Sequence, residues 1–425
     1  MILNFLIYTT LTCGLLTLAH DVRKFGVGLL FYPYFWLYLF VVLYFAIPSI
    51  YAEEISYYYD WNFKEDSIKI VRLLVLYFMV VVLGFYGFFR PMVKKAVSFP
   101  ALNRSQTRAV TLVGLAVLAV LLLILTTQGF DVASKTVEEG YSGDAPLNEN
   151  YKVKSLAYIC MPIIASLVIG GRFALPLLLT LAIVALDVAQ GARTAAILPI
   201  TSLYIAGCVR GRKLYVYWVT PAVVLIYLVG ILFRPEELIN LETIPWQVAV
   251  LGEFRETFAA LPIVIDQKFD FSGSLYNIFL SFIYPLIGPG RKILESVVTN
   301  PGAELATLIG RGYGLGLNIY VEFYYYFSDL GLVLAPWAIS AACVPFVYWL
   351  RKGNRQALVL LCLFLIMIRL AVREGLIANA GLLTYLSITL IVLPRILWKL
   401  LLAASKRTDR INGRPQGIDG EGSHV

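Results

Sequence analysis

Apolar runs of roughly 18 to 20 residues recur along this chain, and each is long enough to cross a lipid bilayer as a helix. Because the bilayer interior offers the backbone no hydrogen-bond partners, runs of this length predict helices. Charged residues make up only 15% of the 425 residues, against roughly 25% in a soluble domain. We therefore expect an all-α, polytopic integral membrane protein.

About eleven spans are expected from these runs. They cover 3–19, 28–49, 70–89, 108–127, 155–170, 173–188, 194–209, 214–233, 331–350, 356–372 and 376–398. The first run has no small-residue cleavage site after it, so we interpret it as a span and not as a signal peptide. The expected domains are an N-terminal bundle (1–233), a long loop (234–330), C-terminal spans (331–400) and a polar, disordered tail (401–425).

Basic residues concentrate in alternate loops, and the loops between them are acidic. Arg23 and Lys24 follow the first run, and Arg210, Arg212 and Lys213 follow the seventh. Since cytoplasmic loops carry the excess of lysine and arginine, we expect the N-terminus and the long loop outside and the C-terminus in the cytoplasm.

Histidine and cysteine chemistry is nearly excluded. The chain has two histidines, His20 and His424, and its five cysteines lie in apolar runs without metal or redox spacing. We expect no metal, no cofactor and no Ser/His/Asp triad. The basic residues are explained by membrane topology, so no nucleic-acid partner is expected.

The long loop carries arginines although its acidic residues outnumber its basic ones. Membrane topology does not favour cations on the outer face, whereas the planar guanidinium binds phosphate oxygens in bidentate fashion. The alternative for each arginine is pairing with a nearby glutamate. We favour that alternative for Arg234, which precedes Glu236 and Glu237.

Residues 246–264 of the loop have helical periodicity, with apolar residues on one face. Arg255 falls roughly 60° from the centre of that face, and Glu253 and Glu256 fall on the other side. This pattern predicts an arginine that faces the protein body while its carboxylate neighbours turn away, as expected at a buried anion. Residues 275–287 are apolar but too short to cross, which predicts a re-entrant or interfacial helix or, alternatively, a short pair of spans.

Two further arginines lie at span ends on the same expected side. Arg193 is in the tight turn 191–194, where backbone N–H groups at the start of a helix favour an anion; an ordinary glycine turn is the alternative. Arg373 and Glu374 end the tenth span, with Arg369 one turn earlier inside it. Charges inside spans usually face an internal cavity.

Glu322 enters an aromatic run, 323–327. An apolar setting disfavours the charged form of a carboxylate, which suits a general base. Tyr320 and Tyr324 are predicted supporting residues because tyrosines stack on sugar faces. An aromatic belt at the membrane interface is the alternative for the tyrosines.

Taken together, these motifs resemble the bacterial O-antigen or oligosaccharide repeat-unit polymerases. The turn 191–194 is similar to that family's (Ser/Gly)-x-Arg-Thr turn, and Arg291 followed by Gly302 is similar to its Arg-x10-Gly pattern. The stretch from Gly316 through Asn318 and Glu322 to Asp329-Leu330-Gly331 resembles the segment entering the next span in polymerases and O-antigen ligases. Ligases carry a histidine where this chain has Leu317, which disfavours a ligase.

The resemblance implies a GT-C-like, metal-independent, inverting glycosyltransferase facing the periplasm in the bacterial inner membrane. It would polymerise oligosaccharides linked to undecaprenyl pyrophosphate in lipopolysaccharide or related polysaccharide biosynthesis. Donor and acceptor would both be lipid-linked and held in membrane lipid, and a chain-length-regulating co-polymerase is an implied partner. Glu322 would be the base, and the donor pyrophosphate would be held by Arg193, Arg255, Arg291 and Arg373. The supporting residues would be Gly302, Asn318, Glu253, Glu256, Tyr320 and Tyr324.

Two other functions stay open at this point. An O-antigen ligase would use the same chemistry with lipid A-core as acceptor. A lipid-linked oligosaccharide flippase, from a different class, would have two similar halves and short loops, and the long loop 234–330 argues against it.

Overall fold

The computed structural model describes residues 2–58, 61–93, 102–139, 153–190, 194–211, 244–249, 251–268, 275–284, 286–287, 304–305, 317–351, 355–393 and 395–396. Of the residues in these ranges 91% are helical and none lies in a strand, which confirms the all-α prediction. Five helices among them are long and apolar enough to cross a membrane: Ile2–Phe25, Pro33–Ile50, Glu65–Met92, Arg104–Ser134 and Ile319–Trp349. The predicted span 214–233 and the tail 401–425 lie outside the described residues.

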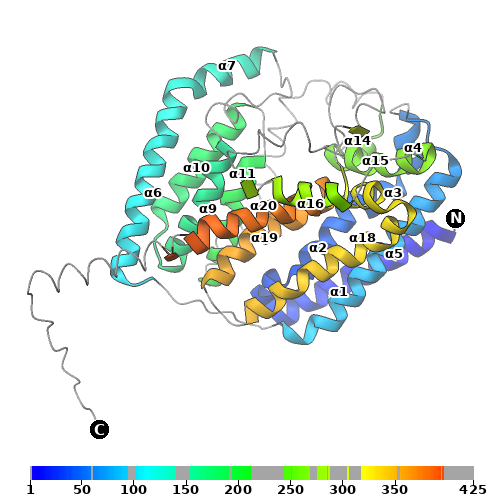
Figure 1. Ribbon diagram of the computed structural model, residues 1–425, viewed down its shortest axis with the longest axis horizontal. Coiled ribbons are helices and arrows are strands. Elements are labelled where there is room, and N and C mark those ends of the chain that lie inside the picture. Colours follow the sequence, from blue (N-terminus) through cyan, green and yellow to red (C-terminus); the bar gives the residue numbers. More distant parts are fainter. Residues whose placement is uncertain are drawn as a thin grey trace, which may run out of the picture.

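The first helices pack together with α18 into one group, on the right in Figure 1. Tyr34 donates from its hydroxyl to the Ser340 carbonyl of α18 at 2.8 Å, and Tyr38 fills the notch that Gly14 leaves in α1. The helices of this group are α1 (Ile2–Phe25), α2 (Pro33–Val41), α3 (Ile47–Ile50), α4 (Ala52–Tyr58), α5 (Glu65–Phe89) and α18 (Ile319–Arg351).

A second group stands on the left in Figure 1 and contains shorter apolar helices. Its members are α6 (Arg104–Ile124), α7 (Phe130–Glu139), α9 (Val153–Ile169), α10 (Ala174–Ala189) and α11 (Thr194–Val209). Asn103 and Gln106 form a capping box that starts α6. The buried helix α19 (Arg355–Glu374) contacts α2 and α18 on one side and α9 and α11 on the other, so it joins the two groups.

The described part of the long loop 234–330 is mostly helical. Its helices are α14 (Trp246–Ala249), α15 (Glu253–Gln267) and α16 (Leu275–Ile283). The single helix predicted over 246–264 is wrong in one respect: Gly252 has φ 46° and ψ −122°, and this conformation divides α14 from α15. The short helix α16 lies along α20 (Ile377–Ser387), where Gly381 leaves space for the backbone of Phe282 (Figure 1).

Helix α18 spans the boundary predicted at residue 330. Helix α18 begins at Ile319, inside the expected loop, and it breaks at Ser328, whose φ is 52° and ψ −141°. Gly331 lies so close to the Phe323 carbonyl that a side chain there would clash with it. The motif 329–331 therefore follows a sharp break between a short helix and a membrane-length helix.

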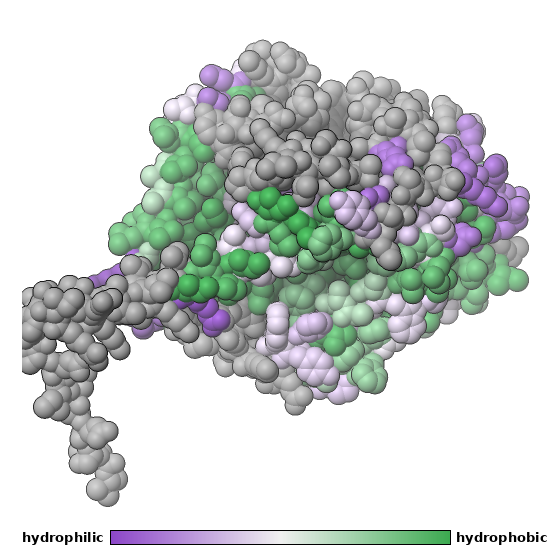
Figure 2. Space-filling model, in the orientation of Figure 1, coloured by the Kyte–Doolittle hydropathy of each residue, from purple (hydrophilic) through white to green (hydrophobic). Residues whose placement is uncertain are grey.

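The loop charges assign several helix ends to the same side of the membrane. In the structure these helix ends contact one another. Asp21 of α1 binds Arg90 after α5, and Arg210 after α11 donates to the Ile169 carbonyl at the end of α9 at 3.1 Å. At the other end, Asp266 of the long loop accepts from the backbone N–H of Lys64 at 2.9 Å. Figure 2 shows apolar residues across α6, α16 and α20 with hydrophilic residues near α7 and α4. Which side faces the cytoplasm stays a prediction.

Candidate functional site

Seven of the predicted site residues gather on three segments that touch one another. Arg255 and Glu256 lie in the first turn of α15, and Arg373 lies near the end of α19, just before α20. The other four lie at or just after the start of α18: Asn318, Tyr320, Glu322 and Tyr324. Arg193, Arg291 and Gly302 lie outside the described residues, and Glu253 is described only as the first residue of α15.

Arg255 faces the protein body, as predicted, and its exposed fraction is 8%. Its Nε and Nη2 donate to Glu256 Oε1 at 3.3 and 2.9 Å. The prediction that Glu256 turns away is therefore wrong. Removing an unpaired cation from water costs several kcal/mol of free energy. The Glu256 carboxylate therefore turns toward the buried Arg255 guanidinium and pairs with it.

Asn318 ties the start of α18 to α15. Its Nδ2 donates to the Thr257 carbonyl at 2.8 Å, and its Oδ1 accepts from the Val321 N–H at 3.1 Å. The side chain is fully buried, so both bonds are made away from water. The predicted supporting residue Asn318 is thus a helix cap that also joins two elements.

Glu322 is buried, and its carboxylate reaches the start of α20. It accepts from the backbone N–H of Leu376 and from that of Ile377, the latter at 3.0 Å. Leu376 is the N-cap residue of α20 and has no side-chain oxygen with which to cap it. The sequence predicted an apolar surrounding for this carboxylate, and the structure adds to it two backbone N–H donors at a helix N-terminus. Its role as a base stays a prediction.

The tyrosines near Glu322 have different surroundings from one another. Tyr320 is fully buried, donates to the Leu74 carbonyl at 2.6 Å and packs edge-on against Phe45 and Phe78. The predicted sugar contact of Tyr320 is therefore wrong: its ring belongs to the core and its hydroxyl is bound to α5. Tyr324 is half-buried against the core.

Tyr326 links the same helix to α16. Its hydroxyl lies 2.8 Å from that of Ser281, and both side chains are buried. The first helical segment of α18 therefore bonds to α5, α15, α16 and α20 through four different side chains: Asn318, Tyr320, Glu322 and Tyr326.

Arg373 immediately precedes the turn whose backbone N–H groups bind Glu322. It is the next-to-last residue of α19, its side chain is 25% exposed, and its Nη1 lies 3.5 Å from Glu374 Oε1. The turn continues through Gly375, with φ 101°, into Leu376. Arg369, one turn earlier in α19, is half-buried.

Asp187 and Asp266 are two carboxylates that sequence reasoning left out. Asp187 is fully buried and accepts from the Ala196 N–H at 2.7 Å and from Gln190 Nε2 at 3.4 Å. A carboxylate of the protein itself thus binds the Ala196 N–H near the start of α11, whereas the anion site predicted beside Arg193 rests on residues 191–193, which lie outside the described residues. The signal was available in the sequence, since Asp187 is a lone acidic residue in the apolar run 174–189.

Asp266 binds the N-terminal end of helix α5, as Asp187 binds that of helix α11. It accepts from the N–H of Lys64, the N-cap residue of α5, and from the hydroxyl of Ser67. Three helix starts, those of α5, α11 and α20, are therefore bound by Asp266, Asp187 and Glu322. Carboxylates at helix N-termini are stabilising because they meet unsatisfied N–H groups and the positive end of the helix dipole.

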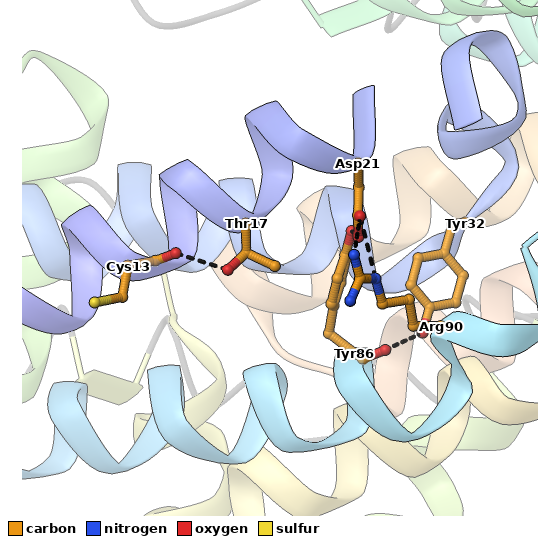
Figure 3. A network of polar contacts seen from close by, with 6 residues as sticks. All are labelled: Cys13, Thr17, Asp21, Tyr32, Tyr86 and Arg90. Atoms are coloured by element: carbon orange, nitrogen blue, oxygen red, sulfur yellow. Dashed lines mark hydrogen bonds and ion pairs between the residues drawn. The ribbon is translucent and has the colours of Figure 1, made fainter. Parts of the chain in front are cut away.

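A different polar network occupies the other end of the bundle (Figure 3). Asp21 is fully buried and accepts from the Tyr86 hydroxyl at 2.7 Å and from Arg90 Nε at 3.1 Å. Tyr32 donates in turn to the Tyr86 carbonyl at 2.6 Å. This network holds the C-terminal ends of α1 and α5 together.

Within the described ranges, no group of three or more His, Cys, Asp and Glu side chains is placed to hold a metal ion. Compared with protein-family models, curated proteins and solved structures, the chain matches none of them. Its resemblance to repeat-unit polymerases is therefore carried by the motif residues alone.

Proposed function

We propose that the protein is an inverting membrane glycosyltransferase that polymerises lipid-linked oligosaccharide repeat units. The supporting observation is that the segments bearing Arg255 and Arg373 are joined by direct hydrogen bonds through the first turns of α18. Asn318 connects to α15 through the Thr257 carbonyl, and Glu322, one turn later, connects to the start of α20. The arginines therefore belong to one bonded unit at one end of the bundle.

In the proposed reaction a hydroxyl of the acceptor sugar attacks the anomeric carbon of the donor. A new glycosidic C–O bond forms, and the C–O bond to undecaprenyl pyrophosphate breaks with inversion. The pyrophosphate leaves with the bonding electron pair, and the hydroxyl proton goes to a base. Guanidinium groups stabilise the charge that develops on the leaving group, so Arg255 and Arg373, with Arg193 and Arg291, are assigned to the pyrophosphate.

Glu322 is the base that the family resemblance suggests. A general base must reach the attacking hydroxyl and release its existing partners to accept the proton. In this structure the carboxylate is 2% exposed and bound to two N–H groups. The base assignment is therefore tested separately from the arginine assignment.

The arginine assignment is tested in a strain that lacks its own copy of this gene and carries plasmid-borne variants. Arg255→Ala combined with Arg291→Ala should leave lipopolysaccharide with a single repeat unit and no ladder on a gel. Lys268→Ala is the matched control, because Lys268 is an exposed cation at the end of the same helix α15. An unchanged ladder in the double variant, at wild-type protein abundance, would contradict the assignment of these arginines to the pyrophosphate.

A further inference from the structure

We propose that Glu322 is a positioning residue, which holds the turn carrying Arg373 in the shape that binds a diphosphate anion. This inference rests on the proposed function, because it takes the anion near Arg373 to be the donor pyrophosphate. In this inference Glu322 does not accept a proton. It acts through Arg373, whose position it fixes.

The first support is the match between the carboxylate and the helix start. Leu376 cannot cap α20 with its own side chain, and Glu322 supplies the acceptor from 54 residues earlier in the chain. Both carboxylate oxygens lie within hydrogen-bond distance of the Ile377 N–H, at 3.0 and 3.2 Å. The carboxylate thus fixes the direction in which the chain leaves Arg373 and enters α20.

The second support is the conformation of the turn itself. Gly375 has φ 101°, which side-chain-bearing residues rarely adopt. A Cβ on Gly375 would lie 2.6 Å from the carboxylate carbon of Glu322. Glu322 therefore lies directly against the turn, and the absence of a side chain at Gly375 is what admits it.

The third support is the way Glu322 is itself anchored. Asn318 precedes it by one helical turn and is fixed to α15 by the bond to Thr257. Glu322 is thereby placed relative to the helix that carries Arg255. Asn318 and Glu322 together then set the relation between the two arginine-bearing segments, which a diphosphate ligand with two charged groups requires.

The experiment measures binding of inorganic pyrophosphate to the purified full-length protein in detergent by isothermal titration calorimetry. The wild type should bind it, and Arg373→Ala should bind it more weakly. Glu322→Gln, which keeps an acceptor oxygen but removes the charge, should weaken binding about tenfold, a loss that corresponds to one charge-assisted hydrogen bond. Glu322→Ala should weaken binding further.

The deciding measurement is a double-mutant cycle. If Glu322 acts through Arg373, Glu322→Gln has no further effect on pyrophosphate affinity in the Arg373→Ala background. Asp266→Asn is the matched control, because Asp266 makes the same kind of bond at the start of α5. That variant should lose thermal stability yet keep wild-type pyrophosphate affinity.

The outcomes separate the two proposals. If Arg373→Ala binds pyrophosphate as the wild type does, the proposed anion site fails. If Arg373→Ala weakens binding while Glu322→Gln leaves it unchanged and stops polymerisation, Glu322 is the base and the positioning inference is overturned. If the two losses simply add, Glu322 does not act through Arg373 and the inference is again overturned.

Discussion

The two ends of the helix bundle use buried charge in different ways. At one end Asp21 binds Arg90 and Tyr86, so charged and polar side chains of separate helices bind one another (Figure 3). At the other end Glu322 and Asp187 bind backbone N–H groups at the starts of helices. The first arrangement fastens helices together, whereas the second sets the shape of turns that adjoin candidate arginines.

Helix direction explains the difference. Helices α1 and α5 end where Arg90 lies, and a helix C-terminus favours a cation. Helices α5, α11 and α20 begin at the opposite end, where a helix N-terminus favours an anion.

The largest expected effect comes from breaking the Asp21 network. Asp21→Ala leaves Arg90 and Tyr86 without their carboxylate, and the loss of hydrogen bonds to a buried charged group costs about 3 kcal/mol. Thermal unfolding in detergent should show the loss, and pyrophosphate affinity below the transition should be unchanged. Asp21→Asn, which keeps an acceptor for Tyr86, should cost less. A loss of pyrophosphate binding in a folded Asp21→Ala protein would contradict the division between the two ends.

A smaller loss is expected at the start of α11. Asp187→Ala removes the acceptor for the Ala196 N–H, and loss of a buried, charged capping acceptor costs about 2 kcal/mol. Hydrogen exchange should accelerate at Ala195 and Ala196 more than at the far end of α11. Asp187→Asn is the milder comparison, since its amide oxygen still accepts one bond. Uniform acceleration along α11 would show that Asp187 does not act as a local cap.

The smallest expected effect is a gain in stability at the break of α18. Ser328 has φ 52° and ψ −141°, a conformation that glycine adopts more readily than serine. Ser328→Gly should therefore raise stability by about 1 kcal/mol, as relief of strained backbone does. Ser328→Ala keeps the Cβ and serves as the control. Equal unfolding temperatures for the two variants would show that the strain at this position is negligible.

The sequence predicted the helices well because span length and apolar composition are local properties. The predicted spans 3–19 and 70–89 lie within α1 and α5, and the short apolar run predicted over 275–287 contains α16. The burial of Arg255 followed from helical periodicity alone. The break at Ser328 did not follow, since serine is an ordinary helix residue and the close approach of Gly331 to Phe323 exists only once the chain has folded.

The amino-acid sequence by itself determined that this is an all-α chain with membrane-length helices, and it pointed to the residues of the candidate site. Only the tertiary structure decided what those residues touch. Glu322 meets the N–H of Leu376 across 54 residues, and Asn318 meets Thr257 across 61. Hydrophobic periodicity records which face of a helix is buried, but the partner of a buried polar group is chosen by packing between helices distant in the chain.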